Sequence, residues 1–335
     1  MEAGTARLEQ IFLELGFKPE GRSFLFLDEI QAFPGIDLLL KLVFDHFPHV
    51  KVIAISSSSL LLLQGLSDSL AGRKYFLELL PLTLSEYSGV EIDDYFNFPE
   101  RITMQEELSQ TIRTFAAYGS YPEVLLKTSL EEKQSKLRDL VDSAIYKDIF
   151  MMENIKAPQV LVKLTTLLAY QIGNLINLHE LAEQLGLSRN TVDQYISILE
   201  KYFIVFRLPP FERNLRSEVS AKHKIYFWDL GIRNAVINRF FPFETRDDRG
   251  ALLENLVIAS VLKRNLYAQR PFNGYFWRTY QGYEIDLVLQ HTREKELWAI
   301  QVTASGKARF SRAFEQYHPT RMITVDLKNA YRFCW

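Results

Sequence analysis

The stretch Phe24-Leu25-Phe26-Leu27-Asp28-Glu29-Ile30-Gln31 is the most informative part of this sequence. Four apolar residues in a row suit a strand that is buried in a parallel sheet. Asp28 and Glu29 then fall at the carboxyl end of that strand, where ligands of open α/β sheets bind. An aspartate at this edge can hold a Mg²⁺ ion on a nucleotide, and the adjacent glutamate can polarise an attacking water. The stretch therefore predicts the Walker B half of a nucleotide site.

The phosphate-binding half of such a site is not found in the 335 residues. A loop that cradles phosphates has the pattern Gly-x-x-x-x-Gly-Lys-[Ser/Thr] ahead of a helix. The one Gly-Lys pair, Gly306-Lys307, has Gln301 at the first glycine position and Ala308 after the lysine. Backbone N–H groups and the loop lysine supply most of the phosphate affinity. We therefore expect no useful ATP hydrolysis by this polypeptide alone.

The composition is that of an ordinary globular protein, with 47% apolar residues, 24% charged residues and a formal net charge of −2. The single cysteine, Cys334, excludes an internal disulfide and a cysteine-rich zinc site. No apolar run approaches the roughly 20 residues that span a bilayer, and the N-terminus has no signal-peptide pattern. We therefore expect a cytoplasmic protein of two or three domains that makes no contact with a membrane.

Strand and helix patterns alternate around the acidic pair. The predicted elements are helices over 5–16 and 36–47, strands over 24–27, 50–55 and 77–80, and mostly helical structure over 84–150. A strand–helix–strand order of this length implies a βαβ unit with a parallel sheet. The strand over 50–55 leads into Ser56 and Ser57, where a nucleotidase places a residue that senses the γ-phosphate.

Residues 178–206 carry the clearest secondary-structure pattern. A short helix ends at Gly186, Ser188 can cap the next helix, and strands follow over 202–208 and 224–228. This order predicts a helix-turn-helix within a winged helix. The candidates for reading bases or phosphates in the major groove are Ser188, Arg189, Asn190, Thr191 and Gln194. The exposed basic residues expected to favour DNA are Lys201, Arg207, Arg213 and Arg216. The alternative is a winged helix that packs against other protein.

The last part of the chain returns to α/β spacing. The predicted elements are a helix over 250–263, strands over 274–277, 284–290 and 298–303, and a helix over 308–316. Restriction-type nucleases place a helical Glu, an Asp and a Glu-x-Lys on such a frame, where the carboxylates hold Mg²⁺ and the lysine steadies the hydroxide.

Only part of this nuclease pattern is present. Glu254 and Asp286 fit it, with Glu284 nearby, but Gln301 and Thr303 stand where the pattern has Glu and Lys. Three interpretations stay open. They are an active nuclease in which Lys307 substitutes, a degenerate nuclease-like binding fold, which we favour, and unrelated packing.

Taken in order, these segments resemble the AAA-type ATPases of bacteria and archaea that carry a C-terminal domain of unknown function. The resemblance rests on residues 24–31, 55–59, 69–73, 79–86, 118–123, 224–231 and 249–255. It implies ATP and Mg²⁺ as cofactors. It also implies roles for five residues: Asp28 and Glu29 as the Walker B pair with Asp28 on the Mg²⁺ ion, Ser56 and Ser57 as nucleotide sensors, and Arg73 as a phosphate contact within one subunit or from its neighbour. In that family the P-loop precedes the first helix, so this chain is expected to start too late to contain it.

The expected fold class is α/β and α+β multidomain. A partial AAA-type P-loop NTPase sheet should occupy residues 1–90, a helical and winged-helix domain 91–245, and a degenerate nuclease-like α/β module 246–335. The expected function is that of an N-terminally truncated ATP-binding protein of this family. The alternative is a nucleotide-independent module that binds DNA, another protein or a second copy of itself.

Overall fold

The computed structural model describes residues 2–18, 21–58, 73–89, 102–153, 155, 157–211, 222–304, 306 and 310–334. The chain divides into two compact units. The first comprises Met1–Leu79 with Lys201–Phe203, and the second comprises Leu80–Glu200 with Ile204–Trp335. Apart from Lys201–Phe203, the regions predicted as a helical and winged-helix domain and as a nuclease-like module thus fall in one unit.

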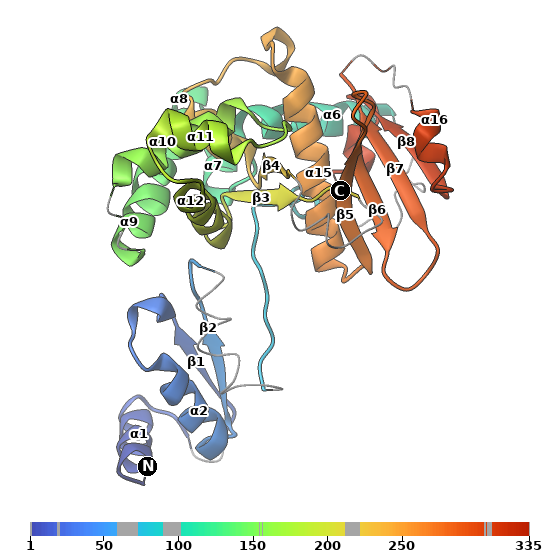
Figure 1. The fold of residues 1–335 in the computed structure, drawn as a ribbon. Coiled ribbons are helices and arrows are strands. Elements are labelled where there is room, and N and C mark those ends of the chain that lie inside the picture. The colour runs from blue at the N-terminus through green and yellow to red at the C-terminus, as the bar shows by residue number, and fades with distance from the viewer. Residues whose placement is uncertain are drawn as a thin grey trace. The chain divides into compact units, whose positions relative to one another are not determined.

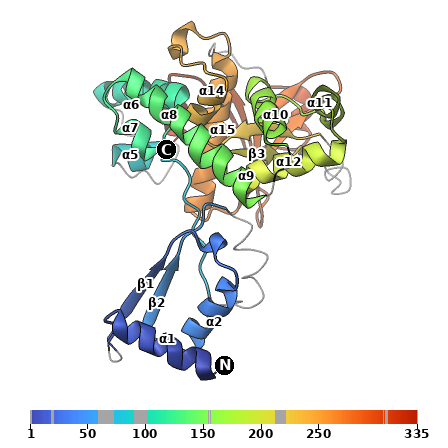
Figure 2. The ribbon, with the colours of Figure 1, turned by 90° about the vertical axis from the view of Figure 1, so that its left-hand side faces the viewer.

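The N-terminal unit contains a βαβ arrangement. Its elements are α1 (Glu2–Glu14), β1 (Ser23–Leu27), the 3-10 helix η1 (Ile30–Ala32), α2 (Ile36–His46) and β2 (Val50–Ala54). The two strands pair in parallel, from Ser23 with Val50 to Leu27 with Ala54. Figure 2 shows them side by side, with α1 and α2 next to them. The parallel sheet predicted from the strand–helix–strand order is confirmed.

The two faces of this small sheet differ. One face is buried against the helices, where Phe12 of α1, Val43 of α2 and Val50 of β2 belong to one apolar cluster. The other face leaves four large apolar side chains exposed: Phe24, Phe26, Ile53 and Ile55. Parallel sheets are usually covered on both faces, so the exposed face is a surface on which further structure can pack.

The strand predicted over 77–80 is wrong. These residues belong to no strand, and Leu77 and Leu79 are 88% and 89% exposed. The N–H of Leu80 donates to the hydroxyl of Tyr267 instead of to a neighbouring strand. An apolar run becomes a strand only where a partner strand accepts its hydrogen bonds. Residues 59 and 69–72, which carry part of the family resemblance, lie outside the described residues.

The second unit begins with helices, as predicted for residues 84–150. They are α5 (Leu84–Ser88), α6 (Ile102–Tyr118), α7 (Pro122–Leu125), α8 (Leu130–Asp139), the π-helix η2 (Leu140–Lys147) and α9 (Asp148–Met152), and α10 (Pro158–Tyr170) follows. Capping boxes fix two of the helix starts, with Thr83 and Glu86 at α5 and with Ser129 and Glu132 at α8.

Two segments that are far apart in the sequence meet at Asp229. This buried residue caps α14 (Leu230–Val236) by accepting the N–H of Ile232 at 3.0 Å, and it accepts the N–H of Ser120 at 2.7 Å. Gly119 has a φ of 70°, and a Cβ there would lie 2.0 Å from the Asp229 carboxylate. Glycine is therefore required at residue 119 both by the backbone conformation and by the close approach.

The helix–turn–helix order predicted for residues 178–201 is confirmed. The elements are α11 (Leu178–Leu185), α12 (Arg189–Lys201), β3 (Val205–Leu208) and β4 (Lys224–Phe227). Gly186 ends α11 in the left-handed conformation. The two strands pair antiparallel, from Val205 with Phe227 to Leu208 with Lys224.

The C-terminal part is a long helix followed by a sheet. The elements are η3 (Phe243–Thr245), α15 (Arg249–Tyr267), β5 (Phe272–Arg278), β6 (Glu284–His291), β7 (Leu297–Val302), α16 (Arg312–Glu315), β8 (Arg321–Val325) and η4 (Ala330–Arg332). The predicted helix and first three strands are confirmed. Figure 1 shows α15 alongside β5.

The sheet has one strand more than the predicted meander. Its order is β5-β6-β7-β8, and β8 joins parallel to β7. The chain between these parallel strands includes α16, and Phe314 of α16 packs on Trp277 of β5. In place of the helix predicted over 308–316, α16 spans four residues, and Ser311 caps its start. Among the described residues, no helix combines the length and the apolar character that crossing a bilayer requires.

Candidate functional site

The parallel pairing of β1 and β2 continues past the strands and joins the segments that follow them. The N–H of Ile55 donates to the carbonyl of Leu27 at 2.8 Å, and the N–H of Ile30 donates to the carbonyl of Ile55 at 3.1 Å. The residues after β1 and the residues after β2 are therefore held side by side at the carboxyl edge of the sheet.

This edge gathers the predicted Walker B and sensor residues. Asp28 and Glu29 follow β1, and Ser56 and Ser57 follow β2. Asp28, Glu29 and Ser57 are exposed, whereas Ser56 is half-buried. Three of the four side chains are thus open to a ligand at the edge where α/β sheets bind their ligands.

Glu29 adopts an unusual backbone conformation. Its φ of 50° and ψ of 43° lie in the left-handed region, which costs a residue with a Cβ about 1 kcal/mol or more. Its N–H donates to the Asp28 carboxylate at 2.9 Å. Such conformations cluster at functional sites, and Glu29 has one directly at this sheet edge.

Gln31 links the two segments. Its side-chain amide donates to the Glu29 carboxylate and, at 2.8 Å, to the Ser57 hydroxyl. The Ser57 hydroxyl lies 3.5 Å from the same Glu29 oxygen. The Gln31 carbonyl oxygen is buried and has no hydrogen-bond partner among the described residues. In the sequence Gln31 stands out only as part of the motif, and its position two residues after Glu29 is the signal for its role.

The two predicted sensor residues do different things. The Ser56 hydroxyl is engaged with the backbone of Ser58, as a donor to its carbonyl at 3.2 Å and as an acceptor from its N–H at 3.3 Å. Ser56 therefore shapes the turn after β2. Ser57, which contacts Glu29 and Gln31, is the hydroxyl that the structure brings to the acidic pair.

Arg73 is engaged elsewhere in the N-terminal unit. Its guanidinium forms an ion pair of 2.6 Å with Asp45 of α2 and lies over the ring of Phe44 at 5.1 Å. In this conformation the Arg73 guanidinium neutralises the carboxylate of Asp45. A contact from Arg73 to phosphate requires the Asp45 pair to open.

The residues at the edge include the type of ligand that Mg²⁺ prefers. That ion is held by one or two carboxylates together with substrate phosphates. Asp28 offers an exposed carboxylate that the Glu29 N–H orients. Asp28 would hold the ion, and the ion would neutralise charge on the phosphates.

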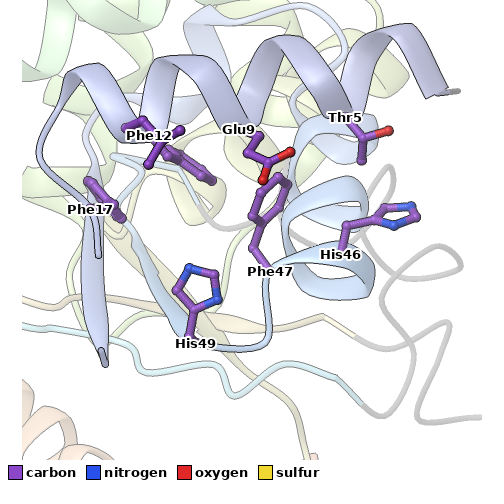
Figure 3. Close-up of a pocket in the computed structure, with 8 residues that line it drawn as sticks. Thr5, Glu9, Phe12, Phe17, His46, Phe47 and His49 are labelled. Atoms are coloured by element: carbon purple, nitrogen blue, oxygen red, sulfur yellow. The ribbon is translucent and has the colours of Figure 1, made fainter. Parts of the chain in front are cut away.

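A pocket in the same unit lies away from this edge (Figure 3). It has a volume of about 310 Å³, and its lining residues are Thr5, Glu9, Phe12, Leu13, Phe17, His46, Phe47 and His49. Phe12 stacks on Phe17 and meets Phe47 edge-on, with ring centroids 4.9 and 5.0 Å apart. Because His49 precedes β2, the pocket lies at the amino end of that strand, opposite Ser57. It is therefore separate from the carboxyl edge of the sheet.

Four of the predicted DNA-reading residues occupy the first two turns of α12, and Ser188 directly precedes the helix. Arg189, Asn190 and Gln194 are exposed. Ser188 and Thr191 are bonded to each other: the Thr191 N–H donates to the Ser188 hydroxyl at 3.1 Å, and the two hydroxyl oxygens lie 2.9 Å apart. These two side chains cap the helix, which leaves Arg189, Asn190 and Gln194 as the groups free to meet a ligand.

The expectation that Arg207 is an exposed basic residue is wrong. Arg207 of β3 forms ion pairs with Asp193 at 2.7 Å and Glu200 at 2.8 Å, both on α12. Its guanidinium also donates to the Ser197 hydroxyl. Arg207 is neutralised and fixes α12 to β3, so it adds no free positive charge for DNA. Arg213 and Arg216 lie outside the described residues.

The three carboxylates of the predicted nuclease-like module converge. Glu254 of α15 and Glu284 and Asp286 of β6 place carboxylate oxygens within 4.8 Å of one another. We call these three residues the acidic cluster. The three carboxylates lie together as the sequence predicted, although Glu254 precedes Glu284 by 30 residues in the chain.

The acidic cluster already contains a cation. Lys224 of β4, which is 1% exposed, forms ion pairs with Glu284 and, at 3.1 Å, with Glu254. The hydroxyl of Tyr226 donates to the same Glu254 oxygen at 2.6 Å. Lys224 and Tyr226 were not predicted as site residues; the signal in the sequence is a lysine at the start of an otherwise apolar strand.

The residues in place of the nuclease Glu-x-Lys do not supply its chemistry. The Gln301 side-chain amide donates to Asp286 at 2.7 Å, as does the N–H of Val302. Thr303 donates its N–H to the carbonyl of Val325 in the next strand, and Lys307 lies outside the described residues. With Lys224 in the acidic cluster and Gln301 bonded to Asp286, the residues present do not fit a divalent metal ion.

The ionisation of the acidic cluster follows from its burial and its charges. Burial, and next the charge of Glu254, raises the pKa of Asp286 to about 8. Burial opposes the charge of Lys224, but the attraction of Glu254 and Glu284 outweighs it and raises the lysine pKa. The cations that face the cluster are Lys224, which is paired with Glu254 and Glu284, and Arg278, which lies 3.4 Å from Glu284.

Three known families match successive parts of the chain. Residues 2–88 match the AAA domain, residues 109–242 match Domain of unknown function (DUF8612), and residues 249–333 match Domain of unknown function (DUF4143). The N-terminal part is thus similar to an AAA domain and the C-terminal part to a domain of unknown function, in agreement with the resemblance seen in the sequence.

The relatives found among curated proteins are all described as uncharacterized. A protein of Methanocaldococcus jannaschii is 25% identical over 313 residues, which cover 91% of this chain and 67% of the relative. A protein of Haemophilus influenzae is 21% identical over 266 residues, 76% of this chain and 62% of the relative. A protein of Mycobacterium tuberculosis is 25% identical over 269 residues, which cover 79% of this chain and 55% of the relative. The chain spans about half to two thirds of the length of these relatives. No solved structure matches it.

Proposed function

We propose that residues 2–88 form the Walker B and sensor half of an ATP-hydrolysing AAA-type site. The observation that carries this proposal is the hydrogen-bonded group of Glu29, Gln31 and Ser57 at the carboxyl edge of two parallel strands. The match of residues 2–88 to the AAA domain supports it independently.

Each residue of this edge takes a role that its chemistry allows. Asp28 holds Mg²⁺ on the triphosphate, and Glu29 polarises the attacking water. Ser57 contacts the γ-phosphate as a sensor. Gln31 keeps the Glu29 carboxylate within reach of Ser57, so that the two segments act as one unit. Arg73 contacts phosphate once it leaves Asp45.

This half-site works with a phosphate-binding loop that is not among the 335 residues. Without such a loop the triphosphate has no nest of N–H groups and no lysine to hold it. The proposed activity therefore belongs to the half-site together with a P-loop segment, and the 335 residues alone release no phosphate from ATP at a useful rate.

A phosphate-release assay tests the proposal. We would fuse a strand, a Gly-x-x-x-x-Gly-Lys-[Ser/Thr] loop and a helix ahead of residue 1, and compare this P-loop chimera with the original chain. The expected result is Mg²⁺-dependent release by the chimera, lost when the loop lysine is changed to Ala. Release by the original chain that disappears in Glu29→Gln would contradict the need for a P-loop. A folded chimera that binds ATP without releasing phosphate would contradict the role of this edge in hydrolysis.

A second function, binding of DNA by a winged helix, is favoured by one observation. Arg189, Asn190 and Gln194 are exposed on the first turns of α12, where a recognition helix carries its base and phosphate contacts. Against it, the ion pairs of Arg207 reduce the free positive charge on this surface.

Gel shifts at low and high salt test this second function. Arg189→Ala should weaken binding about tenfold, the loss of one good contact. Arg293→Ala, which removes an exposed arginine from the turn between β6 and β7, should leave it unchanged. No shift at low salt would remove DNA binding and leave the protein-packing alternative.

A further inference from the structure

The mutual repulsion of the carboxylates in the acidic cluster has to be offset. Three carboxylates whose oxygens lie within 4.8 Å of one another repel strongly in a partly buried site. Proteins resolve such an arrangement with a bound cation, with a basic side chain or by protonation of one carboxylate. The residues around the cluster decide which solution this protein uses.

Lys224 reaches the cluster from outside the module that provides the carboxylates. It lies at the start of β4, whereas Glu254 belongs to α15 and Glu284 and Asp286 belong to β6. Its ammonium is paired with both glutamates and lies 5.8 Å from the ring centroid of Phe276. The side chain is 2% exposed, so the ammonium has exchanged water for these carboxylates.

Other donors also bond to the carboxylates of the cluster. Glu254 also accepts the Tyr226 hydroxyl. Asp286 accepts two hydrogen bonds on one oxygen, from Gln301 and from the backbone of Val302. A metal ion would have to displace the lysine and compete with these donors, at a cost in unpaired buried groups.

We infer that Lys224 is the resident cation of the acidic cluster, in place of a divalent metal ion, and that the cluster serves to lock β4 to residues 249–333. The same strand is held at a second point: the Asn255 side chain donates to the carbonyl of Phe227 and accepts its N–H, both at 2.8 Å. Two consecutive residues of α15 therefore bind the two ends of β4: Glu254 is paired with Lys224 at its start, and Asn255 is bonded to Phe227 at its end. The module that resembles a nuclease acts here as a clamp on the strand pair β3–β4.

Manganese binding to variants of the full chain tests this inference. Lys224→Met removes the ammonium and keeps much of the side-chain volume, which leaves the carboxylates without a cation. We expect Lys224→Met to bind Mn²⁺ at least tenfold more tightly than the wild type in calorimetric or EPR titrations, and its melting temperature to rise with MnCl₂. Lys263→Met is the matched control, because Lys263 is also a buried lysine of the same unit but donates to the carbonyl of Pro81; it should gain no Mn²⁺ affinity.

A second variant covers the case in which Lys224→Met does not fold without metal. Lys224→Met with Glu254→Gln lowers the charge of the cluster and should fold without gaining Mn²⁺ affinity. Because Asp28 is present in every variant, any Mn²⁺ that it binds contributes equally to each titration and does not affect the comparison. The inference is overturned if wild-type protein binds Mn²⁺ at a site that Glu254→Gln abolishes, or if folded Lys224→Met binds Mn²⁺ no better than wild type.

Discussion

Gln31 donates a hydrogen bond of 2.8 Å to the hydroxyl of Ser57, which lies 26 residues further along the chain. The same amide group donates to Glu29. Through these two bonds the residue expected to activate water and the residue expected to sense phosphate are linked by a single side chain. This relationship gives Gln31 a positioning role at the proposed half-site.

We expect Gln31→Ala in the P-loop chimera to lower kcat for ATP about tenfold and to change KM less than about twofold, since small misplacements of a catalytic group cost rate more than binding. Gln10→Ala, which removes an exposed glutamine bonded to Glu14 on α1, should leave both constants unchanged. Equal kcat values for Gln31→Ala and the parent chimera would show that Glu29 needs no support from Gln31.

Gly119 and Gly186 allow a matched test of close packing. Both have a φ near 70°, but a Cβ on Gly119 meets the Asp229 carboxylate at 2.0 Å, whereas a Cβ on Gly186 meets nothing within 4 Å. We expect Gly186→Ala to cost about 1 kcal/mol, the strain of the left-handed conformation, and Gly119→Ala to cost at least about 3 kcal/mol. Urea denaturation measures both; equal losses would mean that Asp229 moves aside freely.

Asp248 is expected to stabilise the second unit in a pH-dependent way. It pairs with the buried guanidinium groups of Arg233 at 2.6 Å and Arg246 at 2.7 Å. Burial opposes its charge, but the hydrogen bonds from Arg246 and Arg233 outweigh burial and hold the Asp248 pKa well below its usual range. Because the folded pKa lies below the unfolded value, this stabilisation is complete above about pH 4 to 5 and is lost as the pH falls through the folded pKa.

Asp248→Asn should therefore cost about 3–5 kcal/mol at pH 7, because it leaves two buried cations with reduced compensation. The difference from wild type should shrink as the pH falls from about 5 to 2. Asp247→Asn is the control: its carboxylate pairs with Arg239 but is 77% exposed, so it should cost less than about 1 kcal/mol. A pH-independent difference between Asp248→Asn and wild type would rule out the proposed linkage.

The exposed face of the β1–β2 sheet should make the chain associate. Phe24, Phe26, Ile53 and Ile55 present adjacent apolar surface there, and contiguous apolar patches drive association. Phe26→Ser should reduce concentration-dependent association in sedimentation experiments. Phe33→Ser, which changes an equally exposed phenylalanine next to η1, should have less effect. An identical response to both changes would show that association does not use this face.

The elements predicted correctly are those whose signals are local. The apolar run at 24–27 with its acidic end, and the helix–turn–helix with Gly186 and Ser188, each contain their own start and stop residues. The strand over 77–80 was wrong because an apolar run does not reveal whether a partner strand exists. The strand β8 was missed for the converse reason: its pairing with β7 is parallel and follows a crossover that the sequence does not mark strongly.

The candidate sites were predictable only in part. The layout of restriction-type nucleases, which Glu254 and Asp286 fit, predicted that these two carboxylates share one site. It did not predict that Lys224, which the sequence assigns to a different element, reaches those carboxylates. Likewise, the sequence alone predicts Arg207 to be a free basic residue, whereas the structure pairs it with Asp193 and Glu200. Long-range ion pairs have no sequence spacing from which to infer them.

The most direct test of the central claim, that Asp28 and Glu29 form a Walker B pair, is a comparison of Asp28→Asn and Glu29→Gln in the P-loop chimera. ATP binding with and without Mg²⁺ and the rate of phosphate release would be measured on the same preparations. We predict that Glu29→Gln keeps Mg²⁺-dependent ATP binding and releases phosphate at least about 100-fold more slowly, whereas Asp28→Asn loses the Mg²⁺ dependence of binding. Phosphate release at the parent rate by both variants would contradict the claim.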